Sequence, residues 1–222
     1  MAWIKGFNFR LSGPFVTDPA NHTFTLGSDV HPVPRNGVYL GYTAGLPQPR
    51  DRDNSLDPRL AGTHFTEGTA AATWRVDMPS SGVVKVYTAV GDSNGAISNG
   101  IVSFFDDATL KFAIDHATGF TTATDRWRDA MDVLLDDEDA VAGVPYGSPR
   151  TVTFASTILN IVLGTASRLG AISHLLLVQE DAAPVVVPAV AATPLRFRRI
   201  SDRPIDRIIP APTILETFQG GG

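Results

Sequence analysis

The feature that most constrains this chain is a period-two alternation of apolar side chains on both sides of a turn. Trp74, Val76 and Met78 alternate with polar residues, residues 79–82 read PSSG, and the alternate positions that follow are Val84, Val86, Thr88 and Val90. Successive side chains of a β-strand point to opposite faces, so this spacing predicts two strands, each with one buried face. The short turn predicts that they pair as an antiparallel hairpin, with Trp74 in the core.

Three further pairs of segments carry strand patterns. The chain begins with predicted strands at Trp3–Leu11 and Phe24–Leu26, separated by glycine and proline. A second hairpin is predicted from Ile101–Phe105 and Thr109–Ile114, with Asp106-Asp107 as its turn. Two closing strands are predicted at Ser156–Leu163 and Ile172–Gln179. This succession of short strands favours an all-β fold.

Two segments lack a single clear pattern. Residues 32–58 contain five prolines, which predicts a long ordered loop around one short strand at Val38–Tyr42. In residues 125–139, Trp127, Met131 and Leu134 match a helical stripe, whereas the apolar residues at 131, 133 and 135 match strand alternation. A short helix and a strand remain equal alternatives there.

The composition changes after residue 181. Residues 182–222 contain six prolines, five arginines and three acidic residues, a charge of +2 that leaves −7 for residues 1–181 of the total −5. We therefore predict a single domain at 1–181, an antiparallel jelly-roll-like β-sandwich, followed by an extended proline-rich arm at 182–222. The opposite charges favour association of the arm with an acidic surface. The predicted partner-binding residues of the arm are Phe197, Arg198, Arg199, Ile208, Ile209, Leu215 and Phe218.

Composition excludes several functional classes. A hydrophobic content of 43% with 18% charged residues is typical of a folded protein. The net charge of −5 argues against a nucleic-acid partner, and no apolar run approaches the length of a membrane span. The chain contains no cysteine, so disulfides, thiolate metal sites and a cysteine nucleophile are excluded.

The candidate catalytic and metal motifs each have a simpler interpretation. Gly91-Asp92-Ser93 follows a predicted strand and matches the nucleophile turn of GDS-type esterases, but the next residues, NGAISNG, do not favour the helix that this turn needs. A β-turn is the favoured interpretation. The acidic run Asp136–Asp139 lacks the glycine and the alternating ligands of a calcium loop, and the five histidines have no metal-ligand spacing. We predict no cofactor and no metal.

The middle of the chain resembles the malectin-like and galactose-binding-like β-sandwiches of some phage and bacterial proteins. The resemblance rests on RDRDNSLDPRLAGTHF (50–65), on TWRVDMPSSGVVKVYTAVGD (73–92) and on the closing strands, and it covers roughly residues 7–180. It implies a sandwich fold, with either carbohydrate binding or a role as a fibre, tail or decoration module of a virion. In the carbohydrate-binding alternative, the candidate sugar contacts are Tyr39, Tyr42 and Asp92.

Together these features predict a binding or assembly protein rather than an enzyme. The leading hypothesis is a structural protein of a phage-like virion, a decoration, fibre or connector component assembled in the host cytoplasm. Its partners would be other copies of itself or other virion proteins, held through the arm. A carbohydrate-binding module is the alternative, with a glycan as partner. An esterase that uses Ser93 is the third hypothesis.

Overall fold

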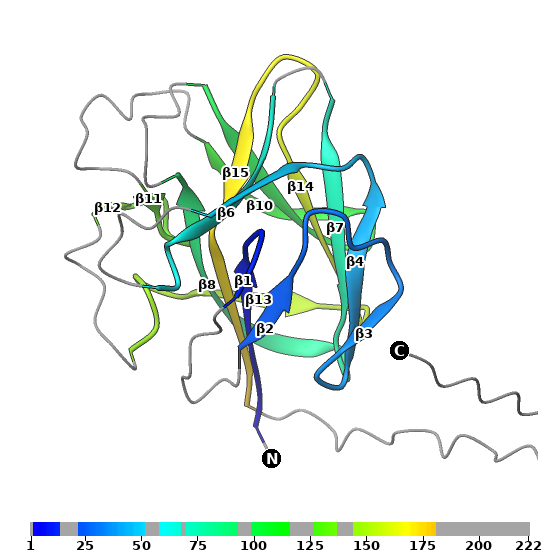
Figure 1. Ribbon diagram of the computed structural model, residues 1–222. Coiled ribbons are helices and arrows are strands. Elements are labelled where there is room, and N and C mark those ends of the chain that lie inside the picture. The colour runs from blue at the N-terminus through cyan, green and yellow to red at the C-terminus, as the bar shows by residue number, and fades with distance from the viewer. Residues whose placement is uncertain are drawn as a thin grey trace, which may run out of the picture. The chain divides into compact units, whose positions relative to one another are not determined.

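The protein is a β-sandwich in the part of the chain that the structure describes. The computed structural model describes residues 2–13, 22–51, 58–67, 70–92, 99–115, 127–136 and 144–180. Among these residues all regular structure is β, and there is no helix (Figure 1). This confirms the predicted all-β class.

Sheet A is one of the two large layers. Its central strands are β8 (Gly82–Gly91), β16 (His174–Gln179) and β1 (Trp3–Phe9), and the short β2 (Thr23–Thr25) runs parallel to β1 at one edge. Along the other side of β8 lie the strands β13 (Arg150–Phe154), β11 (Trp127–Arg128) and, paired with β11, β12 (Leu134–Leu135).

Sheet B is the opposing layer and is antiparallel throughout. Its order is β10 (Thr109–Asp115), β9 (Ile101–Asp106), β14 (Ile158–Leu163), β7 (Ala72–Asp77), β4 (Val38–Ala44) and β3 (Val33–Arg35). A smaller antiparallel sheet, sheet C, consists of β15 (Gly170–Ile172), β6 (Gly62–Thr66) and β5 (Gln48–Asp51).

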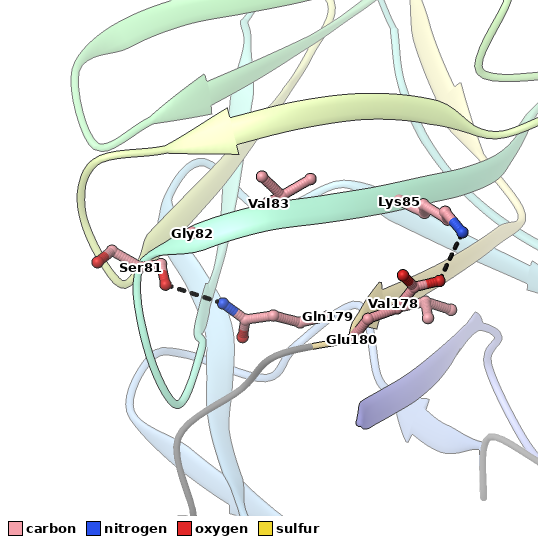
Figure 2. Close-up of a pocket in the computed structure, with 7 residues that line it drawn as sticks. All are labelled: Ser81, Gly82, Val83, Lys85, Val178, Gln179 and Glu180. Atoms are coloured by element: carbon pink, nitrogen blue, oxygen red, sulfur yellow. Dashed lines mark hydrogen bonds and ion pairs between the residues drawn. The ribbon is translucent and has the colours of Figure 1, made fainter. Parts of the chain in front are cut away.

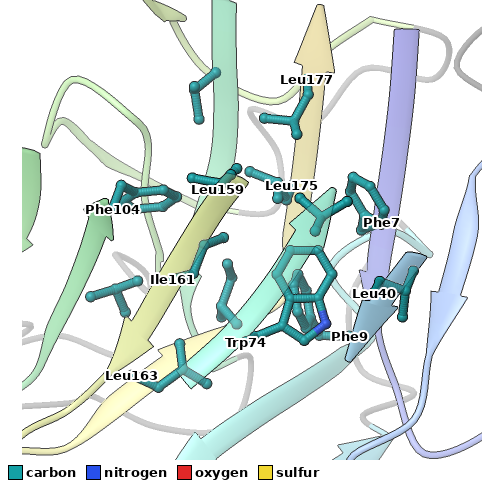
Figure 3. Close-up of a cluster of buried hydrophobic side chains, with 14 of the residues drawn as sticks. Phe7, Phe9, Leu40, Trp74, Phe104, Leu159, Ile161, Leu163, Leu175 and Leu177 are labelled. Carbon is teal, nitrogen blue, oxygen red and sulfur yellow. The ribbon is translucent and has the colours of Figure 1, made fainter. Parts of the chain in front are cut away.

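The main core lies between sheets A and B. Trp74 is fully buried there, and the rings of Phe7 and Phe9 each meet its indole edge-on at a centroid distance of 5.2 Å (Figure 3). Leucine and isoleucine side chains of β14 and β16 fill the space around these rings. The predicted core position of Trp74 is confirmed.

The predicted hairpin at residues 74–90 is wrong in its pairing, although both strands exist. β7 pairs with β4 and β14 in sheet B, whereas β8 pairs with β16, β13 and β11 in sheet A. Residues 78–81 therefore cross from one sheet to the other. Both strands turn their apolar face to the same core, and alternation identifies that face without identifying the neighbouring strand.

The other strand predictions are largely confirmed. β9 and β10 form the predicted antiparallel hairpin. The two closing strands exist as β14 and β16, but they lie in different sheets, with the short β15 between them in sequence. The N-terminal strands are present as β1 and β2.

The proline-rich segment contains more strand than predicted. Besides β4, it contributes β3 and β5, which include Pro34 and Pro49. Both are edge strands, β3 of sheet B and β5 of sheet C. An edge strand needs hydrogen bonds on one side only, so it tolerates proline where a central strand does not.

The ambiguous segment forms strand rather than helix. β11 and β12 pair across a turn in which Asp132 has a positive φ of 66°. The carboxylate of Asp129 accepts hydrogen bonds from the backbone amides of Met131 and Val133, at 2.8 and 3.0 Å. An aspartate that binds nearby backbone amides in this way favours a turn over a helix.

Several predictions fall on residues that the structure does not describe. These are the arm at 182–222 with its seven candidate contacts, Ser93 of the esterase motif, and residues 137–139 of the acidic run. In the described part of the chain, no helix has the length and apolarity needed to cross a membrane.

Candidate functional site

The three predicted sugar contacts do not form one site. Tyr42 is 1% exposed in β4, with its hydroxyl 2.8 Å from Nδ1 of His64, so it cannot stack against a ligand as predicted. Tyr39 is 53% exposed on the same strand. Asp92 follows the end of β8 and is 8% exposed.

Tyr39 and Asp92 also lie at opposite ends of the sandwich. Leu40 is the partner of Val76, so Tyr39 lies beside the end of β7 that leads into residues 78–81 and the start of β8. Asp92 follows the other end of β8, ten residues along. A strand of that length extends roughly 30 Å. No single sugar can contact both residues.

A small hollow beside sheet C combines an aromatic ring with polar side chains, which the predicted sugar site does not. It has a volume of about 180 Å³, and we call it the Phe65 hollow. It is lined by Gly45, Leu46, Gln48, Phe65, Thr66, Glu67, Ala70, Ala71 and Ala72. The ring of Phe65 is half-buried, and Gln48 and Glu67 are exposed beside it.

Strand pairing places the side chains of this hollow. Gln48 and Phe65 are direct cross-strand partners of β5 and β6, so their side chains lie on the same face of sheet C. Arg50, two residues along β5, places its guanidinium carbon 3.7 Å from the centroid of the Phe65 ring. This cation–π contact and the packing of Ala171 and Leu169 hold the ring in position.

The opposite wall of the hollow depends on a glycine. Gly45 begins the β4–β5 turn with a φ of +65°, and a Cβ there would meet the carbonyl oxygen of Ala71 at 2.5 Å. Any other residue would be strained in this conformation and would push the turn away from Ala71. On this side, the backbone of Gly45 and Ala71 sets the shape of the hollow.

A buried hydrogen-bond chain links sheet B to sheet C. Burial lowers the pKa of His64 to about 4, so the ring is neutral at pH 7. Nε2 of His64 lies 3.3 Å from the carbonyl oxygen of Arg10, to which it donates, which leaves Nδ1 to accept from the Tyr42 hydroxyl. Burial and the charge of Asp29 also raise the pKa of Tyr42. Tyr42 thus supports the fold next to Pro49, the cross-strand partner of His64.

A second hollow, of about 280 Å³, lies between the start of β8 and the end of β16. Several of its polar groups already form hydrogen bonds. Lys85 donates to Glu180 at 2.6 Å, and Nε2 of Gln179 donates to the carbonyl oxygen of Ser81 at 3.0 Å (Figure 2). The same nitrogen donates to the carbonyl oxygen of Ser80 at 3.1 Å. None of the described residues that line this hollow is aromatic. It is a weaker candidate for a ligand, because binding would have to displace existing contacts.

The fold also brings together two histidines that are far apart in the sequence. Nε2 of His22 lies 3.2 Å from Nδ1 of His174, and both side chains are buried. Burial, His22 and Arg59 lower the pKa of His174 well below its usual value. Among the described residues, no group of three or more His, Asp or Glu side chains is placed to hold a metal. In the described structure, the two rings form a buried hydrogen-bonded contact.

Comparison with known proteins finds similarity at the level of solved structures. No family model matches the chain, and no curated protein matches it. Among solved structures, a family 35 carbohydrate binding module from an environmental isolate aligns at a TM-score of 0.33 and 13% identity, over 65% of this chain and 94% of that one. The catalytic domain of a GH87 alpha-1,3-glucanase in complex with tetrasaccharides aligns at a TM-score of 0.34 and 12% identity, over 65% of this chain and 26% of that one. The chain thus spans about a quarter of the glucanase domain.

The residues of the Phe65 hollow were not selected from the sequence. Phe65 ends the block RDRDNSLDPRLAGTHF, and Gln48 lies in the segment predicted to be loop. Residues 62–66 read GTHFT, which shows no alternation of apolar and polar residues that would have predicted a strand. What was missing was the pairing of β5 with β6, which places Gln48 and Arg50 beside the aromatic ring.

Proposed function

We propose that this domain is a carbohydrate-binding module and that it binds a sugar in the Phe65 hollow. The observation that carries the proposal is the combination of one fixed aromatic ring, one amide and one carboxylate around a hollow of about 180 Å³. This volume is smaller than that of pockets for drug-sized ligands and suits a single sugar ring.

The chemistry of the lining matches that of a sugar. A pyranose has apolar C–H groups, which can pack against the Phe65 ring, and hydroxyl groups that both donate and accept hydrogen bonds. Gln48 offers a donor and an acceptor, and the carboxylate of Glu67 offers acceptors. Because Arg50 holds the ring in place before binding, little side-chain entropy is lost on binding.

The proposed role is binding without hydrolysis. Most glycoside hydrolases place two carboxylates on either side of the bond that they cleave. Glu67 is the one carboxylate among the described residues that line the hollow. The assembly role predicted from residues 182–222 stays a prediction, because that segment lies outside the described residues.

Glycan-array binding followed by calorimetry tests the proposal. We expect the full chain to bind at least one class of glycan and Phe65→Ala to lose at least tenfold in affinity, because the ring provides the main apolar contact. Gln48→Ala, at an exposed position, should weaken binding without affecting the fold. The control is Tyr39→Ala, which removes an aromatic residue that is 53% exposed elsewhere on the surface. Binding that Tyr39→Ala abolishes and Phe65→Ala leaves intact would contradict the proposed site, and no glycan binding at all would reject the function.

A further inference from the structure

The turn between β3 and β4 is an Asn-Gly turn that faces solvent. Asn36 and Gly37 both have a positive φ, 46° and 80°, as the two central residues of a type I′ hairpin turn require. Arg35 and Val38 are cross-strand partners on either side of them. Both turn residues are exposed, and a Cβ built on Gly37 would meet no atom within 4 Å. Water therefore reaches the peptide group that joins Asn36 to Gly37.

An asparagine followed by glycine carries an electrophile and a nucleophile on adjacent residues. The backbone nitrogen of Gly37 can attack the side-chain carbonyl carbon of Asn36 and close a five-membered ring, and glycine has no Cβ to hinder the attack. Among the described residues, this nitrogen donates no hydrogen bond that would have to break first. Nδ2 of Asn36 lies 3.5 Å from the carbonyl oxygen of His22, which is the limit of a hydrogen bond. Both reacting groups are therefore weakly held.

A buried lysine contacts the peptide group that contains the nucleophile. Nζ of Lys5, on β1, donates to the carbonyl oxygen of Asn36 at 2.6 Å. This oxygen and the nitrogen of Gly37 belong to the same peptide group. When the nitrogen loses its proton, the negative charge spreads onto the oxygen, where the hydrogen bond from Lys5 stabilises it. Lys5 is 7% exposed, so water screens this interaction little.

A second Asn-Gly pair in the described structure is held more firmly. Asn99 lies before β9, and both polar atoms of its side-chain amide form hydrogen bonds. Its Oδ1 accepts from Nε of Arg168 at 3.1 Å, and its Nδ2 donates to the carbonyl oxygen of Ser167 at 3.4 Å. Gly100 is buried and forms an isolated bridge with Leu169. Ring closure at Asn99 therefore requires these contacts to break first.

We infer that Asn36 is a site of spontaneous deamidation, assisted by Lys5. The nitrogen of Gly37 forms a bond to Cγ of Asn36 and gives its proton to water. The Cγ–Nδ2 bond breaks, and Nδ2 takes up a proton and leaves as ammonia. Water then opens the resulting succinimide ring at either carbonyl, which yields aspartate or isoaspartate. Either product adds a negative charge, and isoaspartate also lengthens the backbone of the turn, which weakens the pairing of β3 with β4.

The test is incubation of the full chain at pH 8 and 37 °C, followed by peptide mass spectrometry with fragmentation that locates each modified asparagine. We expect Asn36 to convert at least about tenfold faster than Asn99, because the hydrogen bonds of Asn99 must break before its ring closes. In the urea-unfolded chain, the two sites should convert at similar rates. Lys5→Met, which keeps the apolar stem, should slow conversion of Asn36 at least about threefold, and Lys5→Arg should restore it.

The comparison of Asn36 with Asn99 needs no variant, so it stands even if a Lys5 variant does not fold. Equal rates at the two sites in the folded chain would overturn the inference. A difference that persists in urea would mean that the neighbouring sequence, rather than the fold, sets the rates, and it would overturn the inference as well. A folded Lys5→Met chain that converts Asn36 as fast as the parent chain would overturn the role of Lys5.

Discussion

The two faces of sheet A are built from alternate residues of the same strands, yet they differ in chemistry. On the inner face, Phe7 of β1 pairs with Leu175 of β16, and both are fully buried in the main core. On the outer face, one residue further along, Asn8 pairs with His174, and these two side chains are also fully buried. One face is closed by apolar packing, and the other is buried while remaining polar.

The outer face is buried because other segments cover it. Leu60, Trp127 and Tyr146 form a small apolar cluster on Ala89, which is the cross-strand partner of His174 in β8. Trp127 and Tyr146 are 0% and 1% exposed, so neither ring is available to stack on a ligand. Their role in the described structure is to cover the outer face of sheet A.

The difference shows that a polar residue at an alternate strand position is not necessarily exposed. Within the described residues, neither amide atom of Asn8 has a hydrogen-bond partner, whereas His174 bonds to His22. Burying polar groups costs free energy unless they are paired, so the outer face should stabilise the fold less per area buried than the inner face. Its buried His174 should also make it respond to pH, whereas the apolar side chains of the inner face do not titrate.

The largest expected effect is on the inner face. Trp74→Ala should lower the free energy of unfolding by about 3–5 kcal/mol, because it removes a fully buried indole and leaves a cavity beside Phe7 and Phe9. Chemical denaturation at pH 7 and at pH 5 measures it. The loss should be the same at both pH values. A loss that depends on pH would contradict the assignment of the pH response to the outer face.

The second effect is a loss of stability at acidic pH, which comes partly from the outer face of sheet A. The pKa of His174 is held well below 6.5 in the folded chain, mainly by burial, so between that value and 6.5 the unfolded chain binds more protons than the folded chain. Stability should therefore fall as the pH is lowered through 6.5. His64, with a folded pKa of about 4, contributes in the same direction, by about 3 kcal/mol between pH 7 and pH 4.

His174→Gln isolates the outer-face contribution. This variant should give a shallower loss of stability between pH 6.5 and pH 4 than the parent chain does, and His64→Gln should remove a separate part of the slope. Denaturant midpoints measured at half-unit pH steps provide the readout. An unchanged slope in His174→Gln would mean that the His22–His174 contact does not resist protonation.

A smaller loss is expected in the middle of β8. Val86 is fully buried on the inner face, as its alternation with Val84 predicts, and Val86→Ala should cost about 1–3 kcal/mol. Lys85→Ala, at the neighbouring outward position, is the control. Both side chains of its ion pair with Glu180 are exposed, so the pair should contribute little to the free energy of unfolding. Equal effects at the two positions would contradict the assigned face.

The smallest effect on unfolding is expected from the removal of residues 182–222. If both faces of sheet A are closed by the rest of the chain, the thermal unfolding of the truncated protein should stay nearly unchanged. Association with other copies or partners, measured by light scattering, should be lost, as the arm hypothesis predicts. Unfolding or precipitation of the truncated chain would instead mean that the arm completes the fold.

The functional predictions from sequence depended on pairings that alternation does not encode. Tyr42 was selected as a candidate sugar contact from its type and position, but β4 turns it inward onto His64. Phe65 was not selected, because its neighbours Gln48 and Arg50 lie in a proline-containing segment that reads as a loop. Only the pairing of β5 with β6 makes these three residues one surface.

The sequence by itself determined the all-β class, most of the strands and the inward position of residues such as Trp74 and Val86, because the two-residue repeat of a strand is a local property. The tertiary structure decided that β7 and β8 lie in different sheets, that the outer face of sheet A is covered, and that His22 meets His174. These contacts join residues far apart in the chain. They depend on which faces find partners during packing, and a local pattern does not contain that choice.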